Sequence, residues 1–143
     1  MNEKVIAVRF SGGLKVDAEY RGFKIKTDQP VYQGGEGSAP APFDLFLASL
    51  ATCAGFYVLA FCNGRKLTTD GIDISMAMEK DPETKMIAKI TIRVDLPPGF
   101  PEKYKDAIVK AVDHCAVKSH ILKPPSFETK VGVKPTLLTK QVK

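Results

Sequence analysis

The sequence predicts an α+β fold in which antiparallel sheet packs against two helices. Two observations lead to this prediction. Stretches of alternating apolar and polar residues occur on both sides of one helix-length apolar stretch, and the predicted order βββ-α-ββ-α-(α)-β lacks the regular strand and helix alternation of a parallel sheet. The length of 143 residues and the 44% hydrophobic content fit a single domain, 1–143.

The first predicted element is a three-stranded meander over residues 4–28. Residues 4–10 and 14–20 alternate between apolar and polar side chains, and Ser11, Gly12 and Gly13 between them are typical of a hairpin turn. A second turn at Arg21 and Gly22 precedes another alternating stretch. We therefore expect antiparallel pairing through all three strands.

Residues 29–42, QPVYQGGEGSAPAP, have no periodicity and many glycines and prolines, which predicts a long loop of the kind that often carries function. Residues 43–62 are then apolar on nearly every helical face, so we expect a helix buried all round. The uncharged stretch 45–62 is long enough that a membrane-spanning helix has to be considered. Its hydrophobicity is lowered by Ser49, Thr52 and Gly55. We therefore expect that it does not cross a membrane but forms a core helix covered by sheet and by a second subunit.

The second half of the chain predicts a hairpin, a helix and a last strand. Residues 72–79 and 86–95 alternate around a short polar turn, giving a hairpin over 72–95. Pro101 opens a helix over 101–115 whose apolar stripe ends at Cys115, so this cysteine should face the core. A short helical turn continues to Leu122, and residues 127–133 alternate again as a last strand.

Composition narrows the classes of function. The N-terminal segment lacks the pattern of a secretory signal, so we expect a cytoplasmic protein. The chain has three cysteines, a small and odd number, whereas secreted domains held together by disulfides usually have a larger, even number. The net charge of +5 comes from lysines scattered through the chain, which favours a solvated surface and no nucleic acid partner.

Three motifs in order make the chain resemble the OsmC/Ohr family: the loop GGEGSAPAP, a cysteine within ATC on the apolar helix, and a second cysteine in HCAVKSHIL. The resemblance covers nearly the whole chain. It implies antiparallel sheets around two long helices, an intertwined homodimer, and cysteine sites near the subunit boundary. Characterised members need no metal or cofactor to reduce organic hydroperoxides, and a cellular dithiol then restores them.

The same resemblance assigns roles to two cysteines. In the family, the first cysteine is the nucleophile and the second resolves its sulfenic acid as a disulfide. By position these roles fall on Cys53 and Cys115. Cys62 lies nine residues after Cys53, on the opposite face of the helix, and is interpreted as a small buried hydrophobe.

The nucleophile needs a positive neighbour, because burial in an apolar helix raises the pKa of a thiol. The OsmC branch supplies an Arg from the loop and a Glu that positions it, but Gln33 and Phe43 occupy those places here. Glu36 and Asp44 lie nearby and offer a substitute network. The Ohr branch takes its Arg from the N-terminal strands, which predicts Arg21, and next Arg9, as the activator; alternatively both are surface charges.

Aromatic side chains near Cys53 offer a site for an alkyl group. Phe43, Phe46, Phe56 and Tyr57, with Tyr32, line such a site or belong to the core, and Phe56 and Tyr57 must neighbour Cys53 on the helix. His114 and His120 lie on either side of Cys115 in the sequence. An alternative is therefore a metal site with Cys53, Cys115 and one of these histidines as ligands. The chain has no C-x-x-C or H-x-x-x-H pair, which disfavours it.

Two functions remain open at this point. The first is a thiol-dependent peroxidase acting on organic hydroperoxides. The second is a homodimer with the same fold that lacks the usual Arg and Glu activators and binds a small ligand or senses oxidation without catalysis.

Overall fold

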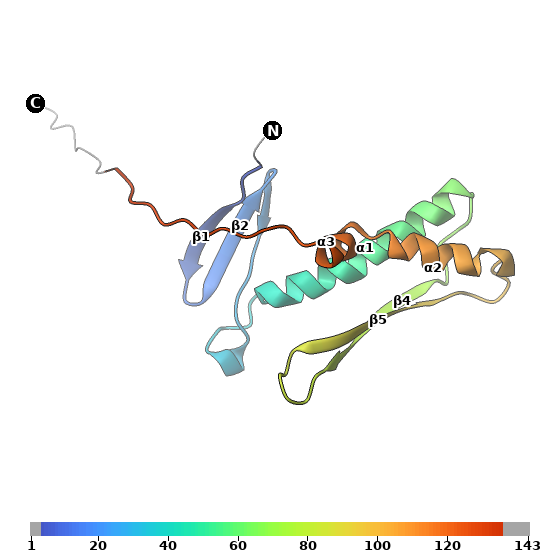
Figure 1. Cartoon of the computed structure of the whole chain (residues 1–143), viewed down its shortest axis with the longest axis horizontal. Coiled ribbons are helices and arrows are strands. Elements are labelled where there is room, and N and C mark those ends of the chain that lie inside the picture. The colour runs from blue at the N-terminus through green and yellow to red at the C-terminus, as the bar shows by residue number, and fades with distance from the viewer. Residues whose placement is uncertain (1–3, 136–143) are drawn as a thin grey trace, which may run out of the picture.

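The chain forms two separate pieces of antiparallel sheet connected by one long helix. The computed structural model describes residues 4–135. Figure 1 shows the N-terminal sheet at one end of α1, and the second hairpin and α2 along its other half. The elements are β1 (Ala7–Gly12), β2 (Lys15–Tyr20), β3 (Phe23–Ile25), a 3-10 turn (Val31–Gln33), α1 (Pro42–Gly64), β4 (Asp73–Lys80), β5 (Ile87–Asp95), a 3-10 turn (Glu102–Tyr104), α2 (Lys105–Asp113) and α3 (Ala116–Leu122).

The predicted α+β class and N-terminal meander are confirmed. The three-stranded sheet has the order β1-β2-β3, with both pairs antiparallel. Gly12 and Gly13 make the first turn with φ values of 105° and 55°, a region that glycine enters without steric cost. The regular strands are shorter than the predicted range, since β1 begins at Ala7 and β3 ends at Ile25, although the carbonyl oxygen of Thr27 still accepts a hydrogen bond from the backbone N–H of Val16 at 3.2 Å.

Asp28 orders the long loop that follows the meander. Its buried carboxylate accepts hydrogen bonds from the backbone N–H of Gln29 (2.7 Å), Glu36 (3.3 Å) and Ser38 (3.0 Å), and from the Ser38 hydroxyl (2.6 Å). Four donors on one carboxylate fold the segment 29–38 back upon itself. The predicted loop is therefore a defined structure.

Helix α1 begins at Pro42, where a missing backbone N–H costs nothing. Asp44 Oδ2 accepts a hydrogen bond from the backbone N–H of Ala41 at 2.9 Å and caps the first turn. Only one stripe of the helix is buried within the chain, and Phe43 and Phe56 remain exposed. The expectation of a helix buried on every face is not met by a single chain, which covers one side only. The buried residues are Leu50, Ala54, Val58, Phe61 and Cys62.

By length and composition alone, α1 is the one helix of the described residues that could cross a membrane. Core helices pass the same test, and α1 packs on α2, α3 and β4.

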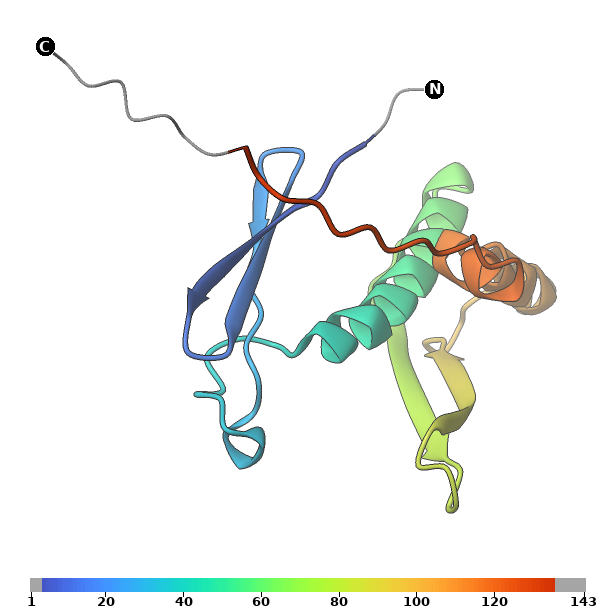
Figure 2. The same cartoon turned by 60° about the vertical axis from the view of Figure 1, so that its left-hand side comes forward.

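The core lies where α1 and α2 meet the β4–β5 hairpin. Buried side chains of the two helices interlock, and apolar side chains of the hairpin cover them. Figure 2 shows α2 and the hairpin on different sides of α1. At the far end of α1 the Arg65 guanidinium lies 3.7 Å from the Phe61 ring centroid. The core helix residues are Ala54, Val58, Phe61, Cys62, Ile108 and Val112.

Two sequence predictions differ from the structure. The helix predicted over 101–115 ends at Asp113, and Cys115 has φ −50° and ψ 123°, outside the helical region, so it caps α3 instead. The strand predicted over 127–133 is not formed in the single chain. That segment is extended and leads away from the helices, with Phe127 90% and Val131 95% exposed, because no strand of the described chain pairs with it.

Candidate functional site

Two cysteines that are distant in sequence meet between α1 and α3. Cys53 is half-buried in the middle of α1, and Cys115 is buried at the residue that precedes α3. Their side chains form a hydrogen bond, and both thiols are free. The backbone N–H groups of Ala116 and Val117 also donate to the Cys53 sulfur. The break after α2 makes this possible, since the first N–H groups of a helix have no partner within it.

The two thiols differ in acidity. Burial acts to raise the pKa of Cys53, but the hydrogen bonds from Cys115 and from the N–H groups of Val117 and Ala116 together lower it below the usual range. For Cys115 the direction is opposite. Burial and the hydrogen bond to Cys53 raise its pKa. Cys53 is therefore the thiol that more readily becomes a thiolate, and Cys115 the one that keeps its proton.

No charged side chain of the described residues contributes to the lowered pKa of Cys53. Arg9 forms an exposed ion pair with Glu19 at 3.3 Å, and Glu36 pairs with Lys15 at 2.5 Å. Arg21 lies at the turn between β2 and β3 with a φ of 52°. Within the described chain these three predicted residues belong to the meander and its loop and contribute neither a hydrogen bond nor a charge to Cys53.

The positions where the OsmC branch has its Arg and Glu are also unconnected to the cysteines within one chain. Gln33 ends the 3-10 turn of the loop, and Phe43 lies exposed in the first turn of α1. Asp44, considered as a substitute for the Glu, caps α1 through the N–H of Ala41.

The four aromatic residues predicted to bind substrate form two pairs on α1. The Phe43 and Phe46 ring centroids lie 5.5 Å apart, and the Phe56 and Tyr57 rings meet edge to face at 5.6 Å. Phe56 is 61% exposed, so these rings are open to a ligand or to a second chain. Tyr32, the fifth candidate, is exposed in the loop.

The remaining candidates contribute no hydrogen bond to either of these two thiols. Cys62 is completely buried in the core, and burial raises its pKa, as expected for a structural cysteine. His114 caps the end of α2, and the Nδ1 of His120 lies 2.6 Å from the carbonyl oxygen of Ala116. Within residues 4–135 no three side chains of the types that bind metals lie close enough to hold an ion.

Sequence reasoning missed the backbone donors at Ala116 and Val117. The only signal was the predicted short helix after Cys115, which looked continuous with the preceding one. Nothing in the residue types shows that the chain breaks at Cys115 and aims its next N–H groups at α1.

A family model described as OsmC-like protein matches residues 35–130. The chain belongs to the OsmC family. The matched range contains all three cysteines and the three α-helices of the described residues. A comparison with curated proteins found no match.

Solved structures of OsmC and related proteins share the fold. One, a candidate osmotic stress induced and detoxification response protein from Psychrobacter arcticus 273-4, superposes with a TM-score of 0.69 at 20% identity, over 83% of this chain and 88% of that one. An OsmC-like protein from Mycoplasma pneumoniae gives 0.64 at 14% identity, covering 85% and 88%. An organic hydroperoxide resistance protein OsmC from Legionella pneumophila gives 0.52 at 21% identity, covering 85% and 90%. The OsmC family thus includes proteins named for resistance to organic hydroperoxides.

Proposed function

We propose that this OsmC-family protein is a cysteine-based peroxidase that reduces organic hydroperoxides in the cytoplasm. The observation that carries the proposal is the hydrogen bond between Cys53 and Cys115, which lowers the pKa of the first thiol and raises that of the second. Such a pair supplies a nucleophile and a second thiol positioned to resolve its oxidised form.

The reaction has two oxidative steps. The Cys53 thiolate attacks the terminal oxygen of ROOH and the O–O bond breaks, so that Cys53 becomes a sulfenic acid. The leaving alkoxide takes up from solvent the proton that Cys53 lost on ionising and departs as the alcohol ROH. The Cys115 thiol then attacks the Cys53 sulfur, and water leaves as the disulfide forms. The hydrogen bond already joins these two sulfurs, so the second step needs no large rearrangement. A cellular dithiol afterwards restores both thiols.

The aromatic rings beside Cys53 favour an organic peroxide over hydrogen peroxide. Phe56 and Tyr57 follow Cys53 by three and four positions on α1 and therefore share its side of the helix. With Phe43 and Phe46 they offer an apolar surface for the alkyl group. An alkyl chain gains about 25 cal/mol for each Å² of apolar surface buried.

We further propose that the active form is a homodimer. The single chain exposes large apolar side chains on the meander, on α1 and along 127–133, among them Phe10 at 89% and Phe127 at 90%. Surfaces of this extent are typical of protein interfaces. A second copy would cover α1, offer a pairing strand to 127–133, and bring Arg21 or Arg9 of its meander toward Cys53.

A second candidate function is a non-catalytic OsmC-like dimer that binds a small ligand or senses oxidation. Gln33 and Phe43 stand where the OsmC branch has its Arg and Glu, and within residues 4–135 no cation contributes to the acidity of Cys53. A sensor would form the same disulfide but would not turn over.

The experiment that separates the two is peroxide consumption with thiol mapping. Cumene hydroperoxide added to the reduced protein should be consumed repeatedly in the presence of dithiothreitol, and without reductant it should leave one Cys53–Cys115 crosslink per chain. Cys53→Ser should abolish consumption. A single stoichiometric oxidation without turnover would favour the sensor, and unchanged thiols the ligand binder.

Cys62→Ala is the matched control. It removes a thiol from the same helix, in the core rather than beside Cys115, and should leave consumption unchanged. Loss of activity in both cysteine variants, with both still folded, would contradict the assignment of Cys53. Arg21→Ala and Arg9→Ala test the activator in the same assay.

A further inference from the structure

The break between α2 and α3 frees the backbone N–H groups that bind both sulfurs of the cysteine pair. The first hydrogen bond within α3 runs from the N–H of Ser119 to the carbonyl oxygen of Cys115 at 2.9 Å, so the N–H groups of residues 116–118 have no partner in the helix. Two of them donate to the Cys53 sulfur and two to the Cys115 sulfur, that of Val117 to both. The acidity of Cys53 therefore depends on how the chain is held at this break.

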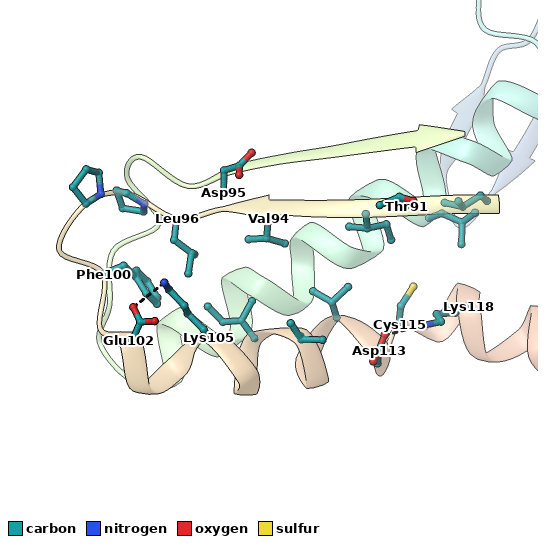
Figure 3. Close-up of a pocket in the computed structure, with 18 of the residues that line it drawn as sticks. Thr91, Val94, Asp95, Leu96, Phe100, Glu102, Lys105, Asp113, Cys115 and Lys118 are labelled. Atoms are coloured by element: carbon teal, nitrogen blue, oxygen red, sulfur yellow. Dashed lines mark hydrogen bonds and ion pairs between the residues drawn. The ribbon is translucent and has the colours of Figure 1, made fainter. Parts of the chain in front are cut away.

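An ion pair spans the break. The Lys118 ammonium on α3 lies 2.7 Å from Oδ1 of Asp113, which is the last residue of α2. Both residues and Cys115 line one end of a groove between β5 and α2, and Figure 3 shows the three of them together there. The ion pair thus connects the end of one helix to the start of the next.

The spacing of the two residues matches a broken helix and not a continuous one. In a continuous helix, side chains three or four positions apart are neighbours, whereas side chains five positions apart point about 140° away from each other around the axis. Asp113 and Lys118 are five positions apart. Forming the ion pair therefore stabilises the broken backbone relative to a continuous helix.

Each of the two charges is unfavourable for its own helix. A carboxylate at the C-terminal end of a helix and an ammonium near the N-terminal end both oppose the helix dipole. Asp113 and Lys118 occupy these two places. Residues that go against a local preference are expected where a functional arrangement needs them. The favourable interaction of each charge is with the other, across the break.

We propose that Asp113 and Lys118 are positioning residues for Cys53. Their ion pair holds the start of α3 so that the N–H groups of Ala116 and Val117 point at the Cys53 sulfur. This role rests on the proposed function of Cys53 and deepens it. Among the described residues neither charge acts on Cys53 directly, since only burial and hydrogen bonds change the pKa of that thiol. The ion pair acts through the backbone.

Charge reversal separates an effect of position from an effect of charge. Asp113→Lys and Lys118→Asp both break the pair, so each should move the midpoint of Cys53 alkylation to higher pH. A direct electrostatic effect would give opposite shifts, because an added cation favours the thiolate and an added carboxylate disfavours it. Exposed ion pairs contribute modestly, so alkylation at neutral pH should slow about two- to five-fold in each variant.

The double variant that exchanges the two residues restores an ion pair of reversed direction. Its midpoint should return to within about 0.2 pH unit of the parent, since the two changes are coupled. Lys105→Asp is the matched control, because it makes the same change of charge as Lys118→Asp and breaks the ion pair of Lys105 with Glu102, which is also 2.7 Å long. That pair lies at the other end of α2, so the midpoint should stay at the parental value.

All variants are made in the Cys62→Ala protein, and the labelling of Cys53 by iodoacetamide is followed by peptide mass mapping. The side chains of Lys118 and Asp113 are 42% and 59% exposed, so the fold should tolerate both reversals. Lys118→Arg keeps the charge and should keep the parental midpoint. A variant that loses only stability would not show this dependence on the sign of the two charges.

Four results would overturn the inference. The two reversed variants could shift in opposite directions, or Asp113→Lys could leave the midpoint unchanged. The double variant could stay as far from the parent as either single one. Lys105→Asp could shift the midpoint as much as Lys118→Asp does.

The alkylation measurement uses no peroxide, which keeps this inference separable from the peroxidase proposal. If cumene hydroperoxide is not consumed but the midpoints move as expected, only the peroxidase proposal fails. If peroxide is consumed and the midpoints of the reversed variants stay at the parental value, only the role of the ion pair fails.

Discussion

The side chains of Cys53 and Cys115 share a hydrogen bond that links the middle of α1 to the start of α3. The bond gives the two thiols different characters, because the pKa of the acceptor falls and that of the donor rises. Three hydrogen-bond donors to the Cys53 sulfur stabilise its thiolate, as a neighbouring guanidinium would. The difference in acidity on which the proposed nucleophile depends thus follows from the packing of two helices.

The first prediction concerns the pH dependence of Cys53 alkylation. In the Cys62→Ala protein, iodoacetamide should modify Cys53 with a midpoint below the ordinary thiol value of 9.0, because the hydrogen bonds from Cys115, Val117 and Ala116 favour the thiolate. Replacing Cys115 by Ala removes the side-chain donor, so the midpoint should move to higher pH. The rate at each pH, followed by mass spectrometry, gives both curves.

Ser119→Ala is the control for that measurement. Its hydroxyl donates to the carbonyl oxygen of Cys115 at 3.0 Å and is not among the hydrogen-bond donors to either sulfur, so the midpoint should not change. A midpoint unaffected by Cys115→Ala, or one above 9.0 in the parent protein, would mean that the thiol pair does not activate Cys53.

The sequence was most informative where an element depends on its own residues. Alternation located the strands around Gly12 and the hairpin ending at Asp95, and the apolar run located α1 to within two residues. The break at Cys115 was missed because nothing local forbids a continuous helix there. The segment 127–133 has a strand pattern, but a strand needs a neighbour, and the described chain offers none.

The candidate site, like the fold, could be predicted from the sequence only in part. The resemblance to the OsmC family supplied Cys53 and Cys115 as a pair, which their separation in sequence alone could not do. The donors at Ala116 and Val117 are backbone groups, so the identity of those residues carries no sign of them.

A second prediction tests the core between the helices and the hairpin. Ile108 is 2% exposed and packs in the main cluster, so Ile108→Ala should lower the free energy of unfolding by about 2–5 kcal/mol through lost burial and the cavity it leaves. Val109→Ala, one position along and 62% exposed, should change it by less than about 0.5 kcal/mol.

Urea denaturation at one fixed protein concentration checks both values, since the stability of the proposed dimer would depend on concentration. A similar loss in the two variants would place the core elsewhere.

A third prediction follows from the carboxylate that orders the loop. The hydrogen bonds from Ser38, Gln29 and Glu36 lower the pKa of Asp28 from 3.8 to about 2. A lowered folded-state pKa stabilises the fold above pH 3.8, and this contribution is lost as the pH falls through about 2. Asp28→Asn should therefore melt at a lower temperature than the parent at neutral pH, and the gap should narrow over that acidic window.

Thermal melts of the two proteins across this range give the comparison. Asp17 and Asp81 also have lowered pKa values, so the parent loses stability in acid for several reasons and only the difference between the proteins reports on Asp28. A gap that stays constant down to pH 2 would show that the charge of Asp28 does not hold the loop.

A fourth prediction concerns the close approach of two backbone segments in that loop. A Cβ added at Gly35 would lie 1.9 Å from the carbonyl oxygen of Gln29. No side-chain movement can relieve this clash, because the Gln29 atom is part of the backbone. Gly35→Ala should force the loop open, lose the hydrogen bond from its N–H to Pro30, and lower the free energy of unfolding by roughly 1–3 kcal/mol. Gly64→Ala is the matched control, since a Cβ there meets nothing within 4 Å. Because Ala has the higher helix propensity, this change should raise the free energy of unfolding by up to about 1 kcal/mol.

Limited proteolysis localises the effect. Cleavage within residues 29–38 should become faster in Gly35→Ala and stay at the parental rate in Gly64→Ala, because a segment must open before a protease can cut it. The position of the loop beside the start of α1 adds a functional readout. If the loop supports the arrangement of Phe43 and Phe46, Gly35→Ala should also raise the KM for cumene hydroperoxide while the alkylation midpoint of Cys53, set by α3, stays unchanged.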